Sequence, residues 1–110
     1  MKILCLAVLL AATPALARVK LVDADPAPRA RVKTPGVIRL HFSEPLAPAD
    51  SGAELIDAKG VRVPVSRSVG GATISLLPLA LKPGVYTVTW HGMGADRRPA
   101  KGKTAFTVIP

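Results

Sequence analysis

The residues that could carry out chemistry in this 110-residue sequence are few, and their spacing argues against catalysis. Glu44 and Asp96 are the carboxylates that could pair for acid–base work, but short strands with tight turns imply no substrate cleft around them. The sequence has no G-x-S-x-G nucleophile turn, and neither His41 nor His91 has an evident serine partner. Residues 92–94 form a lone G-x-G without the helix-opening pattern of a phosphate-binding loop. We therefore expect that the protein is not an enzyme.

Metal binding is the chemistry that the remaining residues could support. The two histidines form no H-x-H or H-x-x-H pair, and both occupy strand positions that alternate with inward residues. An isolated outward histidine on a strand is more often a solvated side chain than a ligand. A soft cuprous site needs several thioethers or thiolates, and after residue 17 the chain has only Met93. We therefore expect no cuprous site. The residues by themselves do not decide whether a cupric site exists.

The N-terminal residues 1–17 have the organisation of a secretory signal peptide. Lys2 provides a positive start, residues 3–12 are apolar, and residues 15–17 form an A-x-A cleavage signal. The apolar run is too short to span a membrane. Cleavage would expose the amino group of Arg18 and remove Cys5, the sole cysteine. The sequence thus predicts one exported, disulfide-free domain over residues 18–110, and its bacterial style of signal indicates the periplasm.

The net charge of +8 falls by one to +7 when Lys2 leaves with the signal peptide. A positive excess favours anionic partners. However, the basic residues are scattered along the chain and only 4% of the residues are aromatic, whereas a nucleic-acid binder clusters its charge and interleaves aromatics for stacking. We expect a soluble protein without a nucleic-acid partner, and the pattern indicates no particular oligomeric state.

The elements that must position these residues are short strands. In residues 85–91, Tyr86, Val88 and Trp90 alternate with Val85, Thr87 and Thr89, which is the period of a half-buried strand. Turn signals at Pro, Gly and Asp positions separate seven such strands, over residues 18–23, 37–42, 53–56, 61–66, 72–77, 85–91 and 103–109. No long window has a helical period. The sequence predicts an all-β, seven-stranded Greek-key sandwich of immunoglobulin-like type, with a loop over residues 92–102.

Four segments, taken in order, resemble the CopC family of small periplasmic copper-resistance proteins. The resemblance extends over residues 18–108 and implies a CopC-like sandwich that binds copper in the periplasm. KLVDADPAP (residues 20–28) resembles the family's K-L-V-x-x-x-P-A, and IRLHFSEPL (38–46) resembles L-x-F-S-E-x-L. LKPGVYTVTW (81–90) is similar to L-x-x-G-x-Y-x-V-x-W, and residues 96–108 are similar to D-x-H-P-x-x-G-x-x-x-F-x-V.

The resemblance also implies a Cu(II) site whose ligands can be compared one by one. The family uses the amine and imidazole of a first-residue histidine, a strand-end carboxylate, and the acid and histidine of D-x-H. In this sequence Glu44 and Asp96 match the two carboxylates, and Arg18 keeps only the backbone amine. Arg98 stands at the loop histidine position, so both imidazoles are replaced by arginine. The expected Cu(II) site is therefore weak or vestigial, with His91 as a possible substitute ligand.

Arginine cannot donate a lone pair to a metal, but its guanidinium pairs well with carboxylates. We therefore expect Arg18 and Arg98 to form ion pairs with Glu44 and Asp96 where relatives hold copper. The alternative is that both arginines stay solvated. For the whole protein, one hypothesis is a periplasmic copper-binding, homeostasis or resistance protein that works with an inner-membrane copper transport protein. The other is a metal-free sandwich that docks on an anionic or membrane-protein partner.

Overall fold

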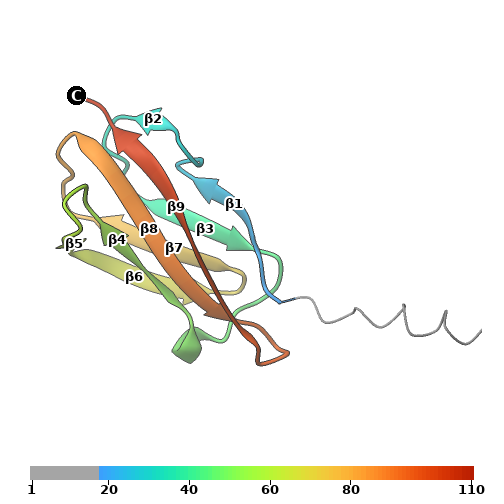
Figure 1. The fold of residues 1–110 in the computed structure, drawn as a ribbon. Helices are drawn as coiled ribbons and strands as arrows, with labels where there is room; N and C mark the ends of the chain where they lie inside the picture. Colours follow the sequence, from blue (N-terminus) through green and yellow to red (C-terminus); the bar gives the residue numbers. More distant parts are fainter. Residues whose placement is uncertain (1–17) are drawn as a thin grey trace, which may run out of the picture.

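A computed structural model describes residues 18–110 as two packed β-sheets (Figure 1). The signal peptide predicted for residues 1–17 lies outside the described residues. One sheet has the strand order β1-β3-β7-β6, and the other has the order β2-β9-β8-β4-β5. In chain order the elements are β1 (Leu21–Asp25), β2 (Arg31–Val32), β3 (Ile38–Phe42), η1 (Pro48–Asp50), β4 (Gly52–Ile56), β5 (Arg62–Val63), β6 (Val65–Gly70), β7 (Thr73–Pro78), β8 (Gly84–Met93) and β9 (Pro99–Val108). The predicted all-β sandwich is confirmed.

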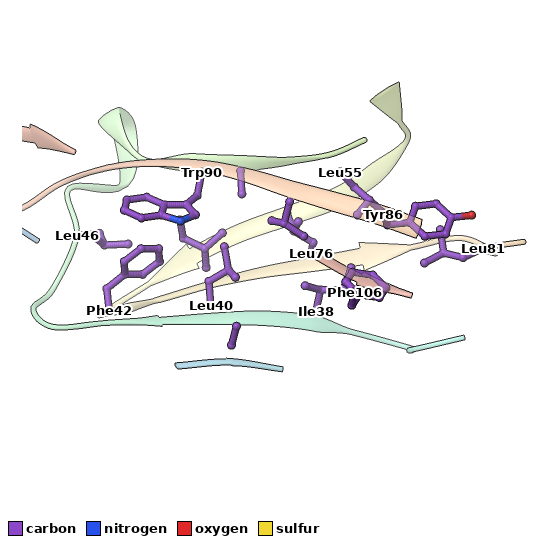
Figure 2. Packing of buried hydrophobic residues seen from close by; sticks show 14 of the residues in the cluster. Ile38, Leu40, Phe42, Leu46, Leu55, Leu76, Leu81, Tyr86, Trp90 and Phe106 are labelled. Atoms are coloured by element: carbon purple, nitrogen blue, oxygen red, sulfur yellow. The ribbon is translucent and has the colours of Figure 1, made fainter. Parts of the chain in front are cut away.

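The core lies between the sheets and is built from residues that alternate along the strands. In β8, Tyr86, Val88 and Trp90 are all buried, as the period of two predicts. Figure 2 shows Trp90 over Phe42 at one end of the core and Tyr86 beside Phe106 at the other. The first pair packs edge to face with ring centroids 4.9 Å apart, and the second stacks at 5.9 Å. These aromatic contacts join β3 to β8 across the sheets and β8 to β9 within one sheet.

The β8–β9 hairpin is longer than the sequence indicated. The two strands pair from Gly84 with Val108 to Met93 with Pro99, so the connecting loop is residues 94–98 and not 92–102. Pairing continues to Pro99 because Gly102 makes room for the indole of the opposite residue, Trp90. A Cβ at Gly102 would lie 2.8 Å from Trp90 Cζ2, which is closer than atoms can pack. The glycine that suggested a loop therefore lies in the middle of a strand.

The prediction of seven strands was wrong by two, because two of the nine strands in residues 18–110 contain only two residues each. β2 pairs in parallel with the end of β9, in a segment expected to be irregular. The expected strand over residues 61–66 divides at Pro64: β5 pairs with β4, whereas β6 pairs with β7 in the other sheet. Proline lacks the N–H that a continuous ladder needs, and the chain changes sheet there.

The first strand is also displaced from its predicted range of 18–23. Lys20 and Ser43 bond to each other instead: Lys20 N–H donates to Ser43 Oγ at 2.9 Å, and Ser43 N–H donates to Lys20 O at 2.8 Å. The ladder with β3 then contains an irregularity between Leu21 and Asp23. Val19 is therefore fully buried whereas Leu21 is only partly so, although a regular strand would place both on the same face. In the part of the chain that is described, no helix has the length and apolarity to cross a membrane.

Candidate metal centre

Glu44 and the β8–β9 loop meet at one end of the sandwich. Glu44 follows β3, and its Oε1 accepts a hydrogen bond of 3.2 Å from the N–H of Ala95. The carboxylate lies against Gly94, where a Cβ would be 2.7 Å from Glu44 Cδ. Only glycine at position 94 allows this approach, because any side chain would displace the carboxylate. The structure thus brings together the strand-end carboxylate and the loop that the sequence singled out separately.

The loop itself uses its acid internally. Asp96 Oδ1 accepts a 3.0 Å hydrogen bond from the backbone N–H of Arg98, and Arg97 N–H donates to Gly94 O at 3.0 Å. Arg97 has a left-handed φ of 62°, a conformation that this compact turn requires. The side chains of Asp96, Arg97 and Arg98 are all exposed. Asp96 therefore acts first as a turn-forming residue, with its carboxylate at the surface.

Arg18 lies near the same end. The Lys20–Ser43 hydrogen bonds hold the start of the described chain beside the residue that precedes Glu44. Arg18 also lines a surface groove together with His91 and Pro99, the residue after Arg98. Figure 1 shows the entry of the chain, η1 and the β8–β9 loop at the same end of the molecule. Arg18, Glu44, Asp96 and Arg98 therefore belong to one region, although they come from three separate segments.

Ion pairing within that region stays a prediction. Within residues 18–110 the structure has one side-chain ion pair, between Arg62 Nη2 and Glu54 Oε2 at 3.2 Å on the β4–β5 edge. Both of these side chains are well exposed, at 71% and 39%, so the pair contributes at most about 1 kcal/mol. The carboxylates of Glu44 and Asp96 instead accept the backbone N–H groups of Ala95 and Arg98.

His91 is exposed on the outer face of its sheet, as the alternation around Trp90 predicts. Its cross-strand neighbours are Gly52 on β4 and Lys101 on β9. A Cβ at Gly52 would lie 3.3 Å from His91 Cε1 and 3.0 Å from Arg67 Nη1, so the imidazole and that guanidinium share the space that the glycine leaves. A metal cation at His91 would therefore face two positive side chains, Arg67 and Lys101, which is electrostatically unfavourable.

The donor set does not fit a histidine-based cupric site. His41 is occupied on the other sheet, where its Nδ1 lies 3.1 Å from Thr73 Oγ1 in a hydrogen bond. Among residues 18–110, no group of three or more His, Cys, Asp or Glu side chains is placed to hold a metal ion. The candidate region therefore offers two carboxylates and the backbone of Arg18, whereas Cu(II) prefers imidazole nitrogen.

Three features of this region were not predicted from the sequence. Gly94 was assigned only to the loop over residues 92–102, although its missing side chain is what admits Glu44. Arg67 is distant from His91 in the sequence, and only the adjacency of β4 and β6 places them together. The groove beside β9 combines two segments, residues 18–21 and 99–103. The G-x-G of residues 92–94 at the end of β8 could have indicated the first feature, but no local signal indicates the other two.

Comparison with known proteins gives a consistent result over nearly the whole described chain. The CopC domain model matches residues 21–109. Copper resistance protein C of Xanthomonas campestris pv. juglandis is 35% identical over 109 residues, which cover 90% of this chain and 86% of that relative. Protein YobA of Escherichia coli strain K12 is 36% identical over 103 residues, covering 87% of this chain and 83% of YobA.

Solved structures extend the likeness to three dimensions. The crystal structure of PcoC, a methionine-rich copper resistance protein from Escherichia coli, has a TM-score of 0.77 at 30% identity, covering 84% of this chain and all of that chain. The crystal structure of CopC from Methylosinus trichosporium OB3b has a TM-score of 0.78 at 28% identity and covers 84% of this chain and 94% of that one. The sequence relatives and the structural neighbours therefore belong to the same group of proteins.

Proposed function

This chain belongs to the CopC family, and we propose that it is a periplasmic copper-handling protein whose Cu(II) site is weak. The observation that carries the proposal is the arginine at both positions where the family pattern has imidazole, Arg18 and Arg98. Guanidinium groups stay charged and offer no lone pair, so neither arginine can replace the lost ligand. What remains of the site is the amino group of a mature Arg18 with the carboxylates of Glu44 and Asp96.

The contacts of both carboxylates support the low affinity that we propose. Each already accepts a backbone hydrogen bond, Glu44 from Ala95 and Asp96 from Arg98. A bound copper ion would have to compete with those bonds and with the positive charge of neighbouring arginine side chains. Copper bound here would be delivered or received by exchange, for which weak binding suffices. The partner class that fits this role is an inner-membrane copper transport protein.

A titration of the exported protein with Cu(II) against a series of competing chelators tests this proposal. We expect weak binding that Glu44→Gln and Asp96→Asn each reduce further, because each removes an anionic oxygen ligand. Glu54→Gln is the matched control: it also removes one carboxylate, but from the β4–β5 edge beside Arg62. Equal effects of Glu54→Gln and Glu44→Gln would show that general charge, and not a site at the loop, governs the binding.

The second hypothesis, a metal-free module that docks on an anionic partner, is favoured by one observation. The groove beside β9 is lined by several basic side chains and, among the described residues, by no acidic one. If the titration detects no copper binding at all and the loop carboxylate substitutions change nothing, this second function replaces the first.

A further inference from the structure

The free edge of β9 borders a surface groove that copper handling does not explain. A groove of about 810 Å³ lies between residues 18–21 and residues 99–103, with Trp90 and His91 completing its lining. Four of the lining side chains are exposed cations: Arg18, Lys20, Lys101 and Lys103. Leu21, Ala100 and the buried Trp90 supply apolar surface in the same groove. The groove therefore combines positive charge with an apolar lining.

The backbone of β9 is paired on one side along its whole length and on the other side only near its end. Arg29 N–H donates to Ala105 O, Thr107 N–H donates to Ala30 O, and Ile109 N–H donates to Val32 O. These bonds show that residues 105, 107 and 109 direct their polar groups away from β8. The N–H and C=O of one strand residue point to the same side, and successive residues alternate between the two sides. Lys101 and Lys103 therefore direct their backbone N–H and C=O groups to the same side as residues 105, 107 and 109. No described backbone group bonds to them there.

We infer that this groove binds an extended acidic segment of another protein, which adds to the sheet along residues 99–104 of β9. An incoming strand would satisfy the free N–H and C=O groups of Lys101 and Lys103. Six residues of strand span about 20 Å, enough for a short peptide. The side chains of such a segment alternate, so one face meets the lysines and the other meets the apolar lining. The segment therefore alternates Asp or Glu with apolar residues.

The two lysines also disfavour a neutral strand or a second copy of this chain as the occupant of the groove. Lysine on a free edge discourages pairing with a second neutral strand. A second copy of the exported chain, with a net charge of +7 after the loss of Lys2, would bring its own Lys101 and Lys103 against the same residues. An acidic segment would instead be attracted electrostatically to both lysines. Trp90 reports on the event, because a Cβ at Gly102 would lie 3.1 Å from Trp90 Nε1, so the indole edge adjoins the groove floor. Within the described chain this buried Nε1 has no hydrogen-bond partner.

The test uses an acetylated octapeptide of alternating Glu and Val, titrated into the full exported protein while the fluorescence of Trp90, the single tryptophan, is followed. We expect saturable binding that weakens about tenfold or more in the double variant Lys101→Glu with Lys103→Glu, because both contacts become repulsive. The matched control, Lys33→Glu with Lys59→Glu, makes the same charge change at two exposed lysines outside the groove, and should retain the affinity.

A second peptide separates strand addition from charge attraction. The same octapeptide with every second backbone nitrogen methylated keeps its charge but cannot pair as a strand. We expect its affinity to be lower by about tenfold or more. Equal binding of the methylated peptide, or equal losses in the two double variants, would overturn the proposal. So would the absence of saturation by the unmethylated peptide up to about 1 mM, which corresponds to a negligible affinity for a dedicated site.

Discussion

The absence of a Cβ atom at two glycines determines how side chains pack at the loop end of this protein. Gly94 admits the Glu44 carboxylate, and Gly102 admits the Trp90 indole. Neither position has a left-handed φ, so the absent side chain, and not backbone freedom, explains both. A Cβ at Gly94 would collide with Glu44 of the candidate site, and a Cβ at Gly102 would collide with Trp90 of the core.

Gly102→Ala should destabilise the fold by about 1–3 kcal/mol, because the new Cβ must displace a large ring in a packed core. Chemical denaturation followed by circular dichroism measures the free energy of unfolding. Gly70→Ala is the control, since that glycine also lies in a strand but a Cβ there meets nothing within 4 Å. A loss at Gly102 no larger than that at Gly70 would mean that the indole moves aside freely.

At the scale of elements, a tyrosine fixes the turn that leads into the longest strand pair. Tyr86 is buried in β8, and its hydroxyl donates a 2.7 Å hydrogen bond to the backbone oxygen of Lys82, four residues earlier. This bond holds the residues before β8 against the strand itself, as in the tyrosine corner of immunoglobulin-like sandwiches. Figure 2 shows the hydroxyl at the end of the core near Leu81.

Tyr86→Phe should lower the free energy of unfolding by about 1 kcal/mol, because one hydrogen bond is lost while the ring keeps its packing against Phe106. The unfolding midpoint in urea measures this, and an unchanged slope of the transition would show that the fold is intact. No change in the midpoint would indicate that water replaces the hydroxyl at no cost.

How far the sequence predicts the structure also differs between elements. The alternation in β3 and β8 correctly predicted which side chains are buried, because those strands are regular and have one face in the core. β2 and the sheet change at Pro64 were not predictable in the same way, since a two-residue pairing depends on a distant partner strand and has no period. The irregularity in β1 had the same kind of cause, a bond to Ser43 from another segment.

For the whole molecule, the family and the sandwich followed from patterns spread along the chain, and both are confirmed. The position of the candidate site was predictable only as a set of separate residues. Their meeting at one end depends on the packing of β3 against the β8–β9 hairpin, and Arg67, which lies near the possible substitute ligand His91, has no motif of its own. The positive groove beside β9 likewise exists only in the folded chain.

We propose that the loss of two imidazoles, and not a loss of the fold, weakens the Cu(II) site of this CopC-family protein. The most direct measurement is a Cu(II) titration with EPR spectroscopy on the exported protein and on the double variant Arg18→His with Arg98→His. Imidazole nitrogen suits Cu(II), so we predict tight binding with nitrogen hyperfine structure in the double variant and weak binding in the unmodified protein. Tight binding by the unmodified protein that His91→Ala abolishes would contradict the account, because His91 would then be the ligand that holds the copper.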